Sequence, residues 1–134
     1  MNTRYVGSRI LPLLVTINGF IVVALGAFGA HRLKVLVGPE ALQIWQTGVR
    51  YQMFHVAALL ACAFFAATRD PDSKAVRWAI FAAGFFVLGI LFFSGSLYLL
   101  VLIQQSWLGL MAAVGGVCFL LGWTSLTVCV VSRS

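Results

Sequence analysis

Residues 76–103 read VRWAIFAAGFFVLGILFFSGSLYLLVLI, and this stretch decides the fold. Arg77 is its only charged residue. An α-helix needs about 20 mainly apolar residues to cross the hydrocarbon core of a bilayer, so this stretch is long enough for one crossing. Because the run is continuous and lacks the apolar–polar alternation of barrel strands, it predicts a transmembrane helix.

Three other segments have the same character, at residues 10–30, 49–68 and 107–131. Of the 134 residues, 62% are hydrophobic and 9% are charged. A soluble domain usually carries about 25% charged residues. The sequence therefore predicts an all-α fold, an integral membrane four-helix bundle that forms one domain over residues 1–134. The expected location is the cell inner (plasma) membrane, which the chain crosses several times.

A short amphipathic stretch precedes the second spanning segment. Pro39 and Glu40 favour a helix start, because proline fits the first turn and an acid suits its positive end. Gln43, Gln46 and Arg50 then fall on one helix face. We expect residues 39–48 to lie at the membrane surface and to continue into the second spanning helix.

Two short connections and the basic residues set the topology. Residues 69–74 form a turn in which Asp72 or Ser73 can cap the third helix. Residues 104–106 are so few that the last two helices must be antiparallel neighbours. One side of the membrane receives Arg4, Arg9, Arg69, Lys74, Arg77 and Arg133, and the other receives Arg32, Lys34 and Arg50. The richer side is predicted to be cytoplasmic, together with both termini.

The net charge of +6 is thus assigned to membrane orientation. No stretch reads as a basic groove with interleaved aromatic residues, so no nucleic-acid partner is expected. The expected partners are the lipid bilayer and other membrane protein subunits or a second copy of the chain.

Small residues mark the expected helix contacts, because helices in lipid associate by close packing. Gly109 and Ala113 are four residues apart, as are Ala112 and Gly116, and we expect Gly116→Leu to disrupt packing. The alternative is that these residues line a pore or a ligand groove. The residues predicted for helix packing are Gly26, Gly29, Gly95, Gly109, Ala112, Gly115, Gly116 and Gly122.

Several motifs together resemble one known family. They are GAFGAH at 26–31, GPEAL at 38–42, GVRYQMFH at 48–55, FSGSLYLL at 93–100, GG at 115–116 and GW at 122–123. In order and spacing they resemble the small four-helix membrane family of the bacterial YgdD and YwdK proteins, a domain of unknown function with a eukaryotic transmembrane relative. The resemblance implies the fold and a membrane location, and it implies no reaction.

The chain departs from that family at one place. The family typically has Thr-Pro where this sequence has Ala112 and Ala113. A proline there would interrupt the fourth helix. We therefore expect the break to be weaker or absent here.

Polar residues of three predicted helices converge on the outer half of the membrane. Intramembrane ionisable residues tend to be functional, which makes His55 the first candidate and His31 the second. Glu40, the only acid on that side, is the expected partner of Arg50 or of a histidine. The predicted ligand-binding residues are His31, Glu40, Arg50, Tyr51, Gln52, His55, Ser94, Ser96 and Tyr98.

The same residues have a structural interpretation. Intramembrane polar groups must be satisfied, so the histidines and serines can simply bond to backbone or to neighbouring helices. Asn18, within the first helix, is expected to make an interhelical hydrogen bond. Four aromatic residues can act as interface anchors, namely Trp45, Tyr51, Tyr98 and Trp107.

Specific chemistries find little support in the sequence. Ser94-Gly95-Ser96 lacks the flanking pattern of a nucleophile elbow, and no paired carboxylates, phosphate loop or zinc spacing occur. We expect no catalytic residues, no metal site and no enzyme activity. The leading hypothesis is a structural or accessory component that acts by helix contacts. The alternatives are a small-molecule or ion binding or transport unit, and a redox subunit with haem or quinone at the histidines.

Overall fold

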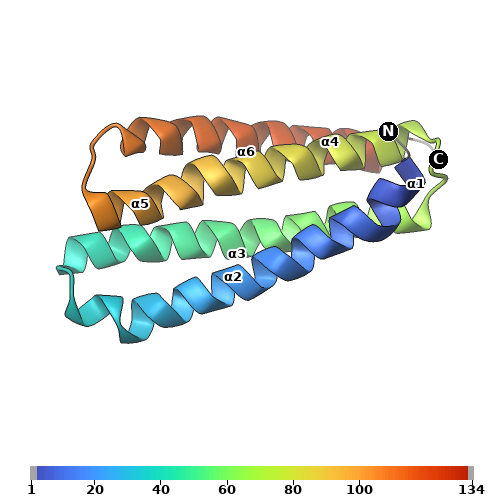
Figure 1. Cartoon of the computed structure of the whole chain (residues 1–134). Helices are drawn as coiled ribbons and strands as arrows, with labels where there is room; N and C mark the ends of the chain where they lie inside the picture. The colour runs from blue at the N-terminus through green and yellow to red at the C-terminus, as the bar shows by residue number, and fades with distance from the viewer. Residues whose placement is uncertain (1–2, 133–134) are drawn as a thin grey trace.

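The structure, a computed structural model that describes residues 3–132, is a bundle of long helices (Figure 1). Four helices are long and apolar enough to cross a membrane within this range, which confirms the predicted all-α membrane bundle. In chain order the elements are α1 (Thr3–Tyr5), the π-helix η1 (Val6–Ile10), α2 (Leu11–His31), the 3₁₀ turn η2 (Leu33–Val35), α3 (Pro39–Thr68), α4 (Lys74–Gly89), the π-helix η3 (Ile90–Ser94), α5 (Gly95–Ile103) and α6 (Leu108–Val131).

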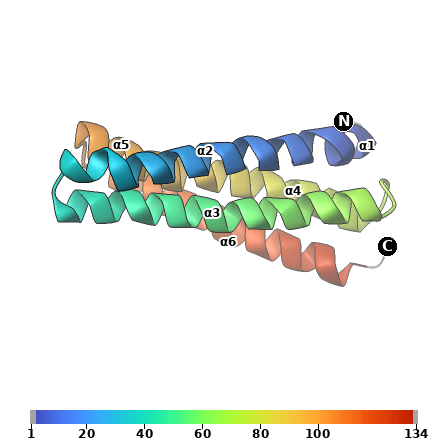
Figure 2. The same ribbon diagram turned by 90° about the horizontal axis from the view of Figure 1, so that it is seen from below.

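The four spans pack in chain order. α2 lies along α3, α3 lies along α4 and α5, and α6 packs on α4, η3 and α5. α3 and α6 approach each other little, and α2 is the least buried span. Figures 1 and 2 show the two ends of the chain at the same end of the bundle, opposite the α2–α3 and α5–α6 connections. Which side of the membrane holds this end stays a prediction, and Arg133, one of the residues behind it, lies outside the described residues.

Local interactions explain where the helices begin and end. The hydroxyl of Ser73, rather than the side chain of Asp72, caps α4 by accepting from the backbone N–H of Val76 at 3.3 Å. At the end of α5, Gln104 adopts a left-handed conformation with φ of 55°, and this closes the helix before the short connection. Pro39 occupies the first turn of α3, as its position in the sequence predicts.

Arg69 joins the end of α3 to the end of α6. Its guanidinium donates to the carbonyl oxygens of Cys129 and Ser132, each at 3.0 Å. These are acceptors at the last turn of α6, where a cation also complements the helix dipole. One side chain therefore holds two helix ends together.

The predicted amphipathic stretch is the beginning of α3 and not a separate element. Gln43, Gln46 and Arg50 are all exposed, which confirms the polar stripe. On the opposite face Trp45 is buried, and its indole N–H donates to the carbonyl of Leu25 at 3.0 Å. Trp45 is thus a packing residue between α2 and α3, and its interpretation as an interface anchor was wrong.

Three of the glycines predicted for packing lie at close helix contacts. A Cβ added at Gly29 would lie 2.7 Å from the ring of Trp45, and one at Gly122 would lie 2.6 Å from the ring of Phe86. A Cβ at Gly115 would collide with the backbone of Phe93. At Gly115 two backbones approach closely, which is the reason why small residues gather at helix contacts in lipid.

Other members of that predicted set do not behave in this way. A Cβ at Gly109 would meet nothing within 4 Å. At Gly26, Gly95 and Gly116 the nearest atoms would lie at 3.5, 3.8 and 4.0 Å, which is ordinary contact. Ala112 is buried. The expected disruption by Gly116→Leu stays a prediction, and Gly116 borders a groove in this structure.

The third span contains a π-turn that a regular helix would lack. η3 lies between Gly89 and Gly95 and shifts the helix faces at this level, as the wider turn of a π-helix does. Ser94 then points to α3, where its hydroxyl donates to the carbonyl of Gly48 at 2.8 Å. The sequence predicted one uniform helix here and missed this turn. α6, in contrast, is unbroken through Ala112 and Ala113, as expected from the missing proline.

Candidate functional site

Three predicted polar residues form a chain of hydrogen bonds across the bundle. The hydroxyl of Tyr98 donates to Oε1 of Gln52 at 2.8 Å, and Nε2 of Gln52 donates to Oδ1 of Asn18 at 3.4 Å. Nδ2 of Asn18 donates to the carbonyl of Leu14 at 3.0 Å. The chain joins α5, α3 and α2 at one level, so it fixes their register and leaves little capacity for a ligand.

The two serines of the third span are also satisfied by backbone. Ser94 bonds to Gly48 of α3, and the hydroxyl of Ser96 donates to the carbonyl of Phe93 at 2.9 Å. Both side chains are buried. Ser94 therefore joins the third span to α3, and Ser96 is bonded within its own span.

His55, the first candidate for a site residue, has both ring nitrogens occupied. Nδ1 lies 2.7 Å from the carbonyl oxygen of Tyr51, and the indole N–H of Trp123 donates to Nε2 at 3.2 Å. A carbonyl only accepts and an indole only donates, so these partners fix the neutral tautomer with the hydrogen on Nδ1. The ring also stacks on Phe119, with centroids 3.5 Å apart and planes at 4°. The two hydrogen bonds and the ring stack hold the His55 side chain rigidly. Its ring nitrogens have no free lone pair for a metal or haem.

The predicted cluster therefore divides into two groups. Gln52, His55, Ser94, Ser96 and Tyr98 are buried and bonded within the bundle, and no buried side-chain polar atom in residues 3–132 lacks a partner. His31, Glu40, Arg50 and Tyr51 are exposed.

The expected pairing of Glu40 with Arg50 was wrong. Glu40 precedes Arg50 by ten positions on the same helix, which separates them by about 15 Å along the axis. The only other acids of the chain, Asp70 and Asp72, lie in the α3–α4 connection at the opposite end of the bundle. Within residues 3–132 no carboxylate therefore lies beside Arg50.

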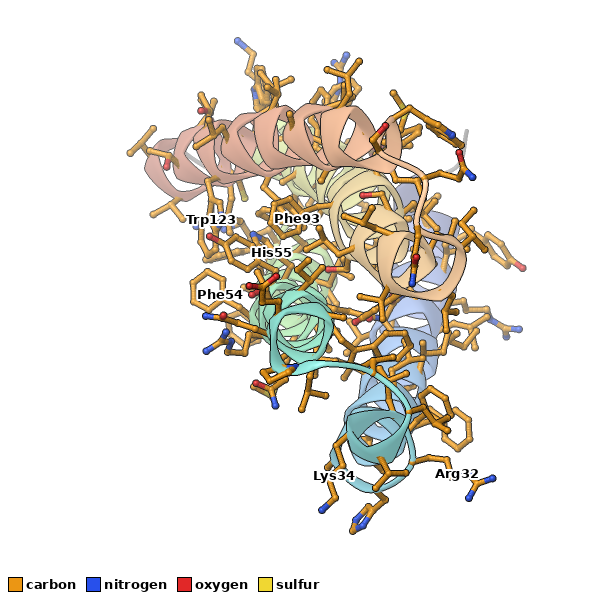
Figure 3. The ribbon with its side chains drawn as sticks, turned by 90° about the vertical axis from the view of Figure 1, so that its left-hand side faces the viewer. Arg32, Lys34, Phe54, His55, Phe93 and Trp123 are labelled. Atoms are coloured by element: carbon orange, nitrogen blue, oxygen red, sulfur yellow. The ribbon has the colours of Figure 1, made fainter. Side chains whose placement is uncertain are left out.

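A lateral groove of about 690 Å³ lies between α3 and α6, where these helices diverge. Its walls are mostly aromatic, with Tyr51, Phe54 and His55 from α3 and Phe119 and Trp123 from α6. Figure 3 shows Phe54, His55, Phe93 and Trp123 gathered on this side of the bundle, away from Arg32 and Lys34 at the end of α2. Phe54 is largely exposed, so the groove opens outward to where lipid would lie.

Sequence reasoning missed most of the groove. Phe54, Phe93, Phe119 and Trp123 were not singled out as site residues, because aromatic residues in an apolar span are ordinary. One signal was available, since Phe119 and Trp123 are four residues apart and so share a helix face. That both residues contact His55 of α3 could not be predicted, because this depends on how the helices pack.

Arg50 lies at one end of this groove, partway along α3 and away from the helix ends. The position of Arg50 along the bundle follows from a nearby contact. Gly48, two residues earlier on α3, accepts a hydrogen bond from Ser94 of the third span. Ser94 lies nine positions before Ile103, the last residue of α5. Nine residues of helix span about 14 Å. Arg50 is exposed, and its guanidinium donates to the hydroxyl of Thr47 at 3.4 Å. A cation thus stands on the outside of a membrane span without an acidic partner.

Tyr98→Phe is expected to lower the free energy of unfolding by about 1 kcal/mol, because Oε1 of buried Gln52 would lose its donor. Reversible unfolding in mixed micelles of a mild detergent and dodecyl sulfate measures this change. Tyr51→Phe is the matched control, because Tyr51 is exposed. Equal effects of the two substitutions would contradict a stabilising role for the hydrogen-bond chain.

Comparison with known proteins gives a consistent family match. The family described as "Protein of unknown function (DUF423)" matches residues 25–116. The chain is 39% identical to the UPF0382 membrane protein YwdK of Bacillus subtilis, over 92% of this chain and 97% of that protein. It is 40% identical to the UPF0382 inner membrane protein YgdD of Escherichia coli (strain K12), over 90% and 88%. A UPF0382 membrane protein of Staphylococcus aureus is 38% identical, over 90% and 93%.

These relatives confirm the resemblance carried by the sequence motifs. No solved structure matches the chain. The name of the E. coli relative and the four apolar spans agree on a multi-pass protein of the inner membrane. The names of the relatives assign no reaction and no ligand.

Proposed function

Because the chain belongs to the DUF423 family of membrane proteins, whose relatives carry no assigned activity, we propose that it is a non-enzymatic accessory protein that binds a membrane-soluble small molecule. The observation that carries this proposal is the groove between α3 and α6. Its volume of about 690 Å³ falls within the range of small-molecule sites, roughly 300–1,000 Å³.

The walls of the groove favour binding over catalysis. His55 is held by two hydrogen bonds and a ring stack, so it is a fixed surface and not a mobile acid or base. Phe86 supports it from behind, with ring centroids 5.5 Å apart. A largely preformed, mostly apolar cleft with one polar group at its end is typical of ligand sites.

A second candidate function is supported by the small residues at the start of α6. Gly109 and Ala113 are both exposed and lie four residues apart, which is the spacing of close helix–helix contacts. A partner helix could lie against this face, and the chain would then act as a component of a larger membrane complex. A haem-bearing subunit is less favoured, because both nitrogens of His55 are occupied.

Photocrosslinking tests the groove directly. A benzophenone side chain is placed at Leu120, which borders the groove, or at Phe20, which is 77% exposed on α2. Each variant is extracted from native membranes in mild detergent, washed to remove bulk lipid, and irradiated. We expect a defined small-molecule adduct at Leu120 and none at Phe20, as read by intact-protein mass spectrometry. Equal yields at the two positions would overturn the proposal, and a protein adduct at Leu120 would favour the second candidate.

A further inference from the structure

A cation on the outer face of a membrane span, with no acidic partner, requires an anion or water beside it. Gly48, two residues before Arg50, lies level with Ser94, about 14 Å from the end of the neighbouring span, and no carboxylate in residues 3–132 is close to Arg50. Charged side chains at such depths are costly, and they usually mark a functional contact. The stem of arginine can reach toward the membrane surface, but its charge still needs a partner there.

The groove continues from Arg50 into an apolar channel. Ala113 lies near the guanidinium end and Trp123 lies at the deeper end, ten residues further along α6. Ten residues of helix span about 15 Å. Because α3 and α6 both run inward from the same end of the bundle, the cation is at the shallow end and the aromatic residues are at the deep end.

A groove with a cation at its shallow end and aromatic residues at its deep end matches the headgroup and acyl chains of a phospholipid. A lipid in the adjacent leaflet places its phosphate toward the surface and its acyl chains toward the midplane. The charge of the surroundings also favours a net negative headgroup, because Arg32, Lys34 and Arg50 stand against Glu40 alone on this side. Basic residues near a membrane surface attract anionic lipids in this way.

We propose that the occupant of the groove is an anionic phospholipid whose phosphate accepts hydrogen bonds from Arg50 and whose acyl chain lies between α3 and α6. This inference rests on the proposed binding function and names its ligand class. The guanidinium provides several donors in a planar arrangement that suits phosphate oxygens. The acyl chain then contacts the aromatic residues that line the groove beyond Arg50, namely Tyr51, Phe119 and Trp123.

Native mass spectrometry of the detergent-solubilised protein tests this assignment, with phosphatidylglycerol or phosphatidylethanolamine added as the probe. The wild-type protein is expected to bind phosphatidylglycerol about tenfold more tightly. Arg50→Gln is expected to remove this preference. Arg32→Gln is the matched control, because it removes an exposed cation from the same side, at the end of α2 and away from the groove. Ala113→Trp fills the groove and is expected to weaken binding of both lipids.

The outcomes distinguish a failure of the anionic-lipid assignment from a failure of the proposed binding function. If Ala113→Trp weakens binding while Arg50→Gln keeps the preference, the groove binds lipid and the role of Arg50 is overturned. If neither variant changes binding, the groove function fails as well. No preference in the wild-type protein would overturn the anionic headgroup. Arg50→Lys keeps the charge and loses the planar donors, so it should retain only part of the preference. Wild-type-like unfolding of each variant shows that a loss of binding is not a loss of fold.

Discussion

Replacing Gly115 with alanine is expected to lower the free energy of unfolding by about 3 kcal/mol, the upper part of the range for overpacked sites. The added Cβ would collide with the backbone N of Phe93 in η3, and backbone cannot move aside as a flexible side chain can. α6 must then shift away from the third span along its whole contact. Unfolding in mixed micelles measures the loss.

Gly109→Ala is the matched control on the same helix. A Cβ there meets no atom within 4 Å, so the variant should be as stable as the wild type or slightly more stable, because alanine favours helix. A loss at Gly109 as large as that at Gly115 would mean that the α6–η3 contact does not determine the difference. It would also point to a partner on the Gly109 face.

Phe86→Ala is the second substitution with a large expected effect, about 3–5 kcal/mol as for other buried phenylalanines. Phe86 is 0% exposed, and its ring fits against Gly122 and contacts the rings of His55 and Trp123. Because apolar burial drives little association within lipid, the loss comes mainly from the packing contacts themselves.

The same variant should also impair the groove, since Phe86 supports two of its wall residues. Phe81→Ala, on the exposed face of α4, removes an equal number of atoms where the ring is 55% exposed. This control is expected to unfold like the wild type within about 0.5 kcal/mol. If both variants were equally destabilised, the core assigned to Phe86 would be wrong.

The sequence predicted the spans well, because length and apolar composition are enough to identify a helix that can cross a bilayer. It also predicted the serine cap of α4 in part, since Asp72 and Ser73 are both able to cap and only the backbone geometry decides between them. The motifs gave the family correctly.

The faces of the helices were much harder to predict. In a membrane protein the lipid-facing and the buried sides are both apolar, so Gly109 and Gly115 look alike in sequence although one is open and one is in tight contact. The polar residues were identified as a group, but their partners were not. Gln52 meets Tyr98 and Asn18 only because three helices pack in one register.

The groove could not be predicted for a related reason. It depends on the divergence of α3 and α6 and on the π-turn η3, which places Phe93 at its edge and Ser94 against α3. A π-turn has no strong sequence signal, because its residues are ordinary helix formers in lipid. The exposed position of Arg50, however, was predicted, because Arg50 shares a polar helix face with Gln43 and Gln46.

The contacts of Arg69 have a consequence for the order in which the protein is made. Its guanidinium binds carbonyl groups that lie 60 and 63 residues later in the chain, at the end of the fourth span. During synthesis the first three spans are complete before these acceptors exist, so Arg69 cannot form these two hydrogen bonds until the fourth span has been made. These hydrogen bonds therefore form only after the last helix is present. A chain that stops short of Cys129 would lack both acceptors, and Arg69 could not link the end of α3 to the end of α6.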